Sequence, residues 1–204
     1  KLKLVATDGH RLALTEMDVT ANAFGEGSVR KAIIPRKGVL ELLKVLDGSD
    51  TFELRLSDKL IAVKSGSYRF TSKLVEGQFP DYNKVVPRGG GTELTIDRQR
   101  LREALQRASI LSNEKYRGIR LLISSGSLKI QANNPEQEEA EEVLEIFYQG
   151  DGLEIGFNVS YILDVLGAVP AAEVKLVLSD GNSSALIEGV DESNSLYVVM
   201  PMRL

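Results

Sequence analysis

The sequence predicts an α+β fold, in which runs of antiparallel strands are interrupted by single helices, with two helices in each complete domain. Short alternating stretches that end at Asp-Gly, Ser-Asp and Gly-Ser pairs indicate strands joined by tight turns. Apolar residues at helical spacing occur in three places, and several strands follow each of them. This order differs from the regular alternation of strand and helix that builds a doubly wound parallel sheet.

An internal repeat organises the chain. Residues 2–8 (LKLVATD) are similar to residues 128–134 (LKIQANN), and residues 52–58 (FELRLSD) are similar to residues 174–180 (VKLVLSD). Self-similarity at a domain-sized period indicates duplicated architecture. The segment from about residue 92 to residue 127 precedes the second copy and has no counterpart before Lys1. We therefore expect the chain to begin in the middle of a domain.

The first part of the chain is expected to hold a hairpin, a further strand, one helix and three more strands. Two alternating runs within residues 1–14 flank Asp8-Gly9, which predicts the hairpin. Residues 32–34 predict the further strand, just ahead of Pro35. The helix that follows has an apolar stripe made of Val39, Leu42, Leu43 and Leu46. The three remaining strands are expected at residues 52–56, 60–64 and 68–74.

Three consecutive glycines at residues 89–91 mark the expected domain boundary, which divides the chain into residues 1–88 and 89–204. Asp97 is the expected N-cap of a helix at residues 98–111, with a buried stripe of Leu101, Ala104, Leu105 and Ala108. A second helix is expected at residues 159–166. Strands are expected at residues 93–96, 119–124, 127–132, 142–148, 153–157, 173–178, 184–188 and 196–200. Two rounds of helix and strands predict a pseudo-twofold domain with both helices on one face.

The composition excludes several kinds of site. The chain has 204 residues, no cysteine, one histidine and a formal net charge of −4. Without cysteine there is no disulfide or thiolate chemistry, and a single histidine nearly excludes a conventional zinc site. No apolar run is long enough to span a bilayer, and residues 1–3 do not open a signal peptide. Because phosphate-binding proteins are usually basic, any DNA contact would need basic residues gathered on one face.

Asp8-Gly9-His10-Arg11 is the cluster that most resembles an active site, and it contains the only histidine. It fits a hairpin turn with exposed polar ends, a binding surface, or a hydrolase that uses Asp8 and His10. No Gly-x-Ser-x-Gly pattern occurs, so the sequence has no nucleophile elbow. The acidic segment at residues 136–142 lacks the spacing and central glycine of an EF-hand, so we interpret it as solvated.

The last seven residues, VVMPMRL, are apolar almost to the end, whereas chain termini are usually polar and frayed. A final strand that docks into its own sheet would explain Val198 and Val199. It would not explain the segment from Pro201 onward, because proline cannot donate to a strand ladder. Met200 and Met202 have the flexible side chains that adaptable binding surfaces use. The alternative is therefore an exposed apolar patch that binds a partner.

Six longer segments carry a family resemblance. They are ATDGHRLA at residues 6–13, FTSKLVEG at 70–77, FPDY at 79–82, LSNEK at 111–115, NNPEQE at 133–138 and YVVMPMRL at 197–204. In this order, over the whole chain, they resemble the bacterial DNA polymerase III β subunit, the sliding clamp. The resemblance implies the DNA clamp (processivity) fold, with residues 1–88 as the latter half of the second domain and residues 89–204 as the third. It also implies a bacterial cytoplasmic protein that has no catalytic residues, metal or cofactor of its own.

The resemblance implies a peptide-binding groove between the second and third domains. Its expected partners are short segments of DNA polymerases, the clamp loader and repair proteins. Carried over by position, the groove residues are Thr7, Gly9, His10, Arg11, Leu12, Pro80, Lys84, Val85, Asn158, Tyr161, Ser184, Val198, Val199, Met200, Pro201, Met202 and Arg203. Lys84 departs from the family pattern, which often has an arginine there. An ammonium cannot stack and fork as a guanidinium does, so the contribution of Lys84 is in question.

In the family, two subunits of three similar domains close a ring around duplex DNA. Ile110, Leu111 and Lys115 lie in the segment expected to meet the first domain of the partner, although residues 110–111 could equally be the buried end of a helix. Helices line the hole, which makes Arg98, Arg102 and Lys37 the expected DNA-facing residues; an ordinary solvated helix face is the alternative. We expect this chain to bind peptides but not to encircle DNA. A general DNA-binding module is a third interpretation, which predicts steeply salt-dependent binding to linear duplex.

Overall fold

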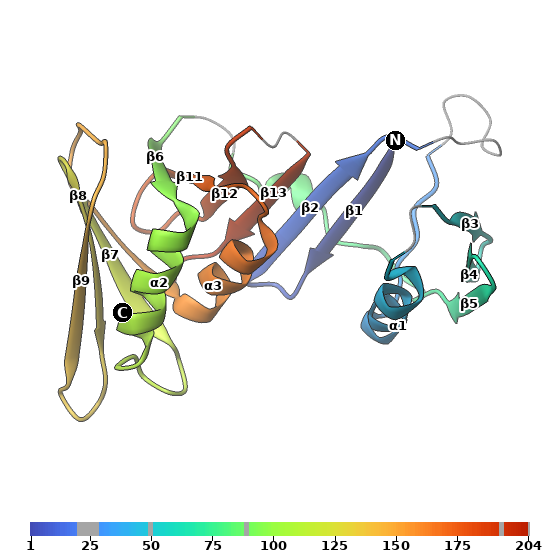
Figure 1. Cartoon of the computed structure of the whole chain (residues 1–204), viewed down its shortest axis with the longest axis horizontal. Coiled ribbons are helices and arrows are strands. Elements are labelled where there is room, and N and C mark those ends of the chain that lie inside the picture. Colours follow the sequence, from blue (N-terminus) through green and yellow to red (C-terminus); the bar gives the residue numbers. More distant parts are fainter. Residues whose placement is uncertain (20–28, 49–50, 88–89, 192–193, 204) are drawn as a thin grey trace. The chain divides into compact units, whose positions relative to one another are not determined.

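Neighbouring strands are antiparallel in every sheet of the described residues, in agreement with the predicted α+β class. The computed structural model describes residues 1–19, 29–48, 51–87, 90–191 and 194–203. The largest sheet has six strands in the order β1-β2-β13-β12-β11-β6 (Figure 1). Their bounds are β1 Leu2–Thr7, β2 Arg11–Met17, β13 Ser195–Val199, β12 Ala185–Gly189, β11 Glu173–Leu178 and β6 Thr92–Asp97.

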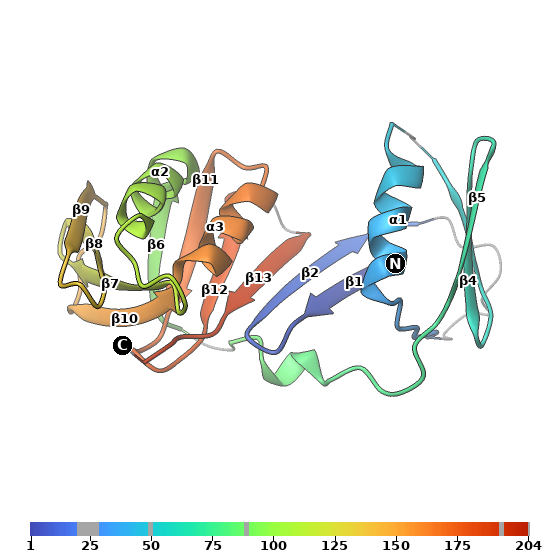
Figure 2. The ribbon, with the colours of Figure 1, turned by 90° about the horizontal axis from the view of Figure 1, so that it is seen from below.

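A second sheet and two helices complete the larger part of the molecule. The sheet has the order β10-β7-β8-β9, with β10 Leu153–Asn158, β7 Gly118–Ser124, β8 Ser127–Asn133 and β9 Glu139–Glu145. Helices α2 (Arg98–Ser109) and α3 (Val159–Ala168) lie side by side, as Figure 2 shows. The predicted stripe of α2 is confirmed, because all four of its residues are buried in the main core.

Among the described residues, no helix is long and apolar enough to cross a membrane.

The chain divides into two compact units, which are residues Lys1–Thr20 with Tyr82–Leu204, and Ala21–Asp81. The larger unit also contains the short 3-10 helix η1, Tyr82–Lys84. The smaller unit packs helix α1 (Arg36–Leu46) on a sheet of β3 (Glu53–Leu56), β4 (Leu60–Ser65) and β5 (Tyr68–Lys73). Residues 1–20 join the larger unit because β2 pairs with β13. The domain boundary expected at residues 88 and 89 lies outside the described residues and stays a prediction.

The predicted repeat falls on matching elements. Residues 2–8 and 128–134 coincide with β1 and β8, each of which is the first strand of a hairpin. Residues 52–58 and 174–180 coincide with β3 and β11. In both copies one helix, α1 or α3, is followed by three strands in sequence. The similarity of sequence therefore reflects a similarity of local structure.

One prediction about the smaller unit is wrong. Residues 32–34 form no strand, and the backbone N–H of Val75 donates a single hydrogen bond to the carbonyl of Ile33. Pro35 follows with φ −65° as the N-cap of α1, and it has no N–H with which to extend a ladder. The apolar stripe of α1 is also partly open to solvent, because the side chain of Leu43 is 63% exposed.

The acidic segment near residue 139 also differs from expectation. The predicted strand at residues 142–148 is β9, Glu139–Glu145, because its partner β8 begins at Ser127 and pairs with Glu145. The segment is mostly exposed to solvent, as expected, but Glu142 also bonds a helix. Arg107 of α2 donates from Nε and Nη2 to the two carboxylate oxygens of Glu142, both at 2.8 Å. These bonds attach the edge strand β9 to helix α2.

Replacing Leu105 by alanine should destabilise the larger unit by about 2–5 kcal/mol, because its side chain is fully buried and the change leaves a cavity. Urea unfolding followed by circular dichroism would measure the loss. Ile110→Ala, one helical turn further on, is the control, and its cost should be about 0.5 kcal/mol or less because Ile110 is 76% exposed. Equal losses for the two variants would contradict the packing described.

Candidate functional site

The predicted groove residues of the larger unit gather around three elements. The first is the turn between β1 and β2, the second is the C-terminal segment after β13, and the third is the junction of β10 and α3. Pro80 belongs to the smaller unit, so its part in the groove stays a prediction. Figure 2 shows β13 beside β2, so the last strand of the chain lies next to its second strand.

The floor of the site is a row of side chains that crosses four strands. Thr7 of β1 pairs with Leu12 of β2, Leu12 pairs with Val198 of β13, and Val198 pairs with Leu186 of β12. Residues directly opposite one another project from the same face of a sheet. Leu12 and Val198 are 3% and 0% exposed. Together with Leu14 they form a second apolar cluster, separate from the main core.

One segment covers part of this floor. Tyr82, Val85 and Val86, in and just after η1, pack against the second apolar cluster. The predicted groove residue Val85 is half-buried in this contact. Because Leu12 and Val198 are nearly inaccessible, they support the site from below rather than offer their own surface. The accessible positions around them are Thr7, His10 and the half-buried Met200.

The β1–β2 turn is locked by its own side chains. The hydroxyl of Thr7 donates to the carbonyl of Arg11 at 2.7 Å and accepts the backbone N–H of Gly9 at 3.1 Å. One carboxylate oxygen of Asp8 accepts the backbone N–H groups of His10 and Arg11, both at 3.0 Å. Gly9 has a φ of +88°, a conformation that glycine adopts without strain. The Thr-Asp-Gly sequence therefore presents His10 and Arg11 in a fixed geometry.

These contacts explain Asp8 without catalysis. Burial raises the pKa of its carboxyl, but hydrogen bonds from the backbone of His10 and from the side chain and backbone of Arg11 outweigh it and lower the pKa overall. Both carboxylate oxygens are thus occupied by the turn and by Arg11. Within the described residues there is also no group of three or more His, Cys, Asp or Glu that could hold a metal ion.

The C-terminal segment is attached at two points beyond β13. The backbone N–H of Met200 donates to the carbonyl of His10, and that of Met202 donates to the carbonyl of Gly156 in β10, both at 2.9 Å. Pro201 lies between them and has no N–H to donate. The interpretation of a strand docked in its own sheet is confirmed as far as Val199, and partner binding by the residues beyond it stays a prediction. Val198 is docked in the sheet, whereas Met200, Pro201 and Met202 remain half-buried along the surface.

Arg11 links the turn to helix α3. Its Nε donates to Asp8 at 3.0 Å, its Nη1 donates to Asp164 at 2.5 Å, and its guanidinium lies 4.5 Å from the ring centre of Tyr161. The ring of His10 is 6.3 Å from that of Tyr161. Burial lowers the pKa of Arg11, but the bonds to Asp164 and Asp8 outweigh it and raise the pKa overall. Sequence reasoning missed Asp164, although its place three residues after Tyr161 puts both on one helix face.

The remaining predicted groove residues differ in their exposure and in the contacts that they make. Asn158 caps α3 by accepting the backbone N–H of Ser160 at 2.9 Å, and Ser184 is half-buried just before β12. Arg203 is exposed. Val199 alternates with Val198 and packs into the main core on the opposite face. Its side chain is therefore turned away from the floor, and the groove contributions of Val199 and Lys84 stay predictions.

The predicted subunit-contact and DNA-facing residues lie elsewhere. Ile110 is exposed at the end of α2, Leu111 is half-buried, and the ammonium of Lys115 lies 5.1 Å from the ring centre of Tyr116. Arg98 donates from Nε and Nη1 to the carbonyls of Ala171 and Leu166, at 2.8 and 3.1 Å. These bonds commit part of its guanidinium to the end of α3. Arg102 is half-buried on α2, and Lys37 is exposed on α1.

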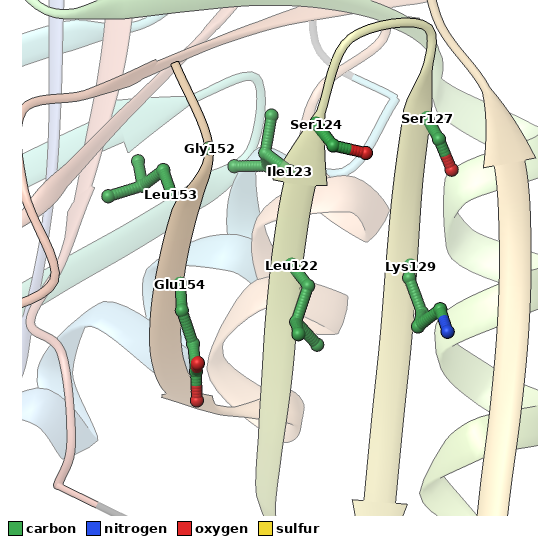
Figure 3. A pocket seen from close by; sticks show the side chains of 8 residues that line it. All are labelled: Leu122, Ile123, Ser124, Ser127, Lys129, Gly152, Leu153 and Glu154. Carbon is green, nitrogen blue, oxygen red and sulfur yellow. The ribbon is translucent and has the colours of Figure 1, made fainter.

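A hollow on the second sheet is a weaker candidate. It measures about 410 Å³ and is lined by residues of β7, β8 and β10, as Figure 3 shows. Its two charged side chains are already paired, Lys129 with Glu141 at 3.1 Å and Glu154 with Arg120 at 3.3 Å. Leu122 pairs with Glu154 on one side and with Lys129 on the other, so it separates these two charged residues in one cross-strand row. The other polar side chains of its lining are the hydroxyls of Ser124 and Ser127, so among the described residues the hollow offers no unpaired charged group, and it is not a preferred site.

Comparison with known proteins decides the family. The model of the DNA polymerase III beta subunit, central domain, matches residues 1–81, and that of its C-terminal domain matches residues 83–203. The chain belongs to the DNA polymerase III β subunit family. The resemblance noted in the sequence is thereby confirmed. Two of the six segments that carry it contain the β1–β2 turn, within residues 6–13, and the C-terminal segment of the candidate site, within residues 197–203.

Several sliding clamps are similar over the whole chain. The Beta sliding clamps of Pseudomonas aeruginosa and Escherichia coli K12 are 55% and 49% identical over all of this chain and 55% of their own length. A crystal structure of the Pseudomonas aeruginosa β subunit has a TM-score of 0.94 at 55% identity, covering 99% of this chain and 55% of that one. A Caulobacter crescentus β subunit has a TM-score of 0.92 at 34% identity, covering 99% and 54%. The predicted clamp fold is confirmed, and the chain spans about half the length of these clamps.

Asp8→Asn should make the larger unit of this clamp chain less sensitive to acid. The folded pKa of Asp8 is lowered, so its carboxylate contributes stability above the unfolded pKa, and this contribution is lost as the pH falls through the folded pKa. Thermal unfolding between about pH 6 and pH 3 would measure the effect. Asp151→Asn, at an exposed position before β10, is the control. Parallel pH dependences for wild type and Asp8→Asn would contradict this role of Asp8.

Proposed function

We propose that this chain is part of a sliding clamp, a non-catalytic processivity factor that tethers DNA polymerase III to duplex DNA in the bacterial cytoplasm. Family membership and the clamp fold support this proposal. Residues 1–88 would be the latter half of the central clamp domain, and residues 89–204 the complete third domain. The local activity that the site favours is capture of short extended peptides.

The observation that carries peptide capture is the attachment of an apolar C-terminal segment beside the row Thr7–Leu12–Val198. Met200 follows Val198 by two residues, and its N–H bonds the turn at His10. Its side chain therefore lies on the same face as the buried floor. Apolar side chains next to a rigid polar turn suit a peptide that inserts aliphatic or aromatic anchors and pairs its backbone at the rim.

The expected affinity is modest. Burying two apolar anchors contributes roughly 3–6 kcal/mol before hydrogen bonds are added and the ordering of the peptide is subtracted. Dissociation constants of about 1 μM follow from a net free energy near −8 kcal/mol. Such binding lets DNA polymerases, the clamp loader and repair proteins exchange on one groove. A Pseudomonas aeruginosa clamp 55% identical to this chain has been solved bound to griselimycin, which supports a ligand site on clamps of this kind.

DNA would be held by the closed ring of two subunits rather than by strong contacts. Arg102 and Lys37, with Arg98 in part, would touch phosphates weakly and without sequence preference, which suits a protein that slides. Ile110, Leu111 and Lys115 would contact the partner subunit. A chain of 204 residues, alone, would then bind peptides without closing the ring around DNA.

Calorimetric titration of the chain with the peptide Gln-Leu-Ser-Leu-Phe tests peptide capture. Micromolar binding is expected, and Met200→Ala should weaken it about tenfold by removing one apolar contact. Met17→Ala is the matched control, because Met17 is 42% exposed at the other end of β2. Unchanged affinity in Met200→Ala would place the peptide elsewhere. Leu12→Ala is informative only if its unfolding curve stays cooperative, since Leu12 is buried.

Binding to linear duplex DNA tests the alternative of a general DNA-binding module. By fluorescence anisotropy at physiological salt, we expect a dissociation constant weaker than about 10⁻⁴ M. Tighter binding with a steep dependence on salt would favour the alternative. Retention on circular DNA after loading by a clamp loader would contradict the view that this chain alone does not encircle DNA.

A further inference from the structure

Arg11 closes a circuit of contacts around the candidate groove. The turn holds the C-terminal segment through the N–H of Met200, and that segment holds β10 through the N–H of Met202. Strand β10 continues directly into α3, and α3 returns to the turn through Asp164 and Arg11. Each of the three groove elements is thus joined to the other two. In this circuit Arg11 makes the bond between side chains, whereas the other two bonds are between backbones.

The two carboxylates that bond Arg11, those of Asp8 and Asp164, differ in their other contacts. Asp8 bonds the backbone of its own turn as well as the guanidinium, so its loss would disturb the turn itself. Asp164 reaches Arg11 from α3 and is 65% exposed, whereas the side chain of Arg11 is 33% exposed. Exposed ion pairs contribute little to stability. The effect of Asp164 is therefore expected in the orientation of Arg11 rather than in the stability of the fold.

We propose that Asp164 is a positioning residue for the peptide groove. It keeps the guanidinium of Arg11 over the ring of Tyr161, so that Arg11 forms a fixed wall between the turn and α3. This inference rests on the proposed peptide-binding function. The guanidinium is suited to this task, since its Nε bonds Asp8, its Nη1 bonds Asp164, and its carbon atom lies over an aromatic ring.

The same arrangement sets the charge that a peptide meets. The two carboxylates of Asp8 and Asp164 face the single positive charge of Arg11, so the three side chains together carry one net negative charge. Asparagine at position 164 would neutralise the group and leave the Nη1 end of Arg11 without its carboxylate. A peptide bearing a carboxylate should then gain relative to its amide counterpart, by about twofold for charges some 8 Å apart in water. A purely structural role of Asp164 would weaken both peptides equally.

The test compares Asp164→Asn with the wild-type chain by calorimetry, using the peptides Gln-Leu-Asn-Leu-Phe and Gln-Leu-Asp-Leu-Phe. We expect binding of the amide peptide to weaken about threefold to fivefold, a change typical of one lost orienting contact. The ratio of affinities should move toward the acidic peptide. Asp164→Glu should restore most of the binding, and Asp151→Asn should change neither quantity. Thermal unfolding of Asp164→Asn should stay within about 2 °C of wild type.

A readout without peptide separates this inference from the proposed function. In nitrogen-15 spectra, the Nη1–H groups of Arg11, which donate to Asp164, should be protected from exchange in the wild type and in Asp151→Asn, and should exchange faster in Asp164→Asn. Absence of peptide binding to the wild type would overturn the proposed function. The exchange signal of Arg11 would still test whether Asp164 positions Arg11. Unchanged affinities together with an unchanged Arg11 signal in Asp164→Asn would overturn the positioning role.

Discussion

The pairing of β2 with β13 is the interaction on which the rest of the site depends. It joins the first strands of the chain to the last strand and makes one six-stranded sheet of segments nearly two hundred residues apart. In its register Leu12 lies opposite Val198. Side chains alternate between the faces of a strand, so a slip by one residue would exchange Val198 with Val199. The floor of the groove would still hold a valine, but Met200 would turn away from the groove to the opposite face.

The rest of the site follows from that register. Because β13 ends beside the β1–β2 turn, the N–H of Met200 finds the carbonyl of His10, and the segment beyond Pro201 runs on to β10. Arg11, the first residue of β2, is carried to within reach of α3. A rigid turn, an apolar segment and a helix are thereby held together without a metal or a covalent link among the described residues. Such a surface is suited to repeated, reversible binding.

Local patterns in the sequence predict much of this molecule. Asp8-Gly9 predicted the hairpin, and the spacing of Leu101 and Leu105 predicted the buried face of α2. The strand expected at residues 32–34 was wrong because propensity does not reveal whether a partner edge is available. The same limit hid Asp164, which meets Arg11 only because residues far apart in sequence fold together. Likewise, nothing local shows that Arg98 bonds carbonyls at the end of α3.

The most direct test of this account is to map peptide contacts on the isotopically labelled chain by nuclear magnetic resonance. Titration with Gln-Leu-Ser-Leu-Phe should shift backbone signals of residues 7–12, 158–164 and 198–203 together, because these three segments form one connected site. Signals around the hollow near Leu122 should stay unchanged. Shifts centred on that hollow or on α2, with the β1–β2 turn unaffected, would contradict the assignment of the groove.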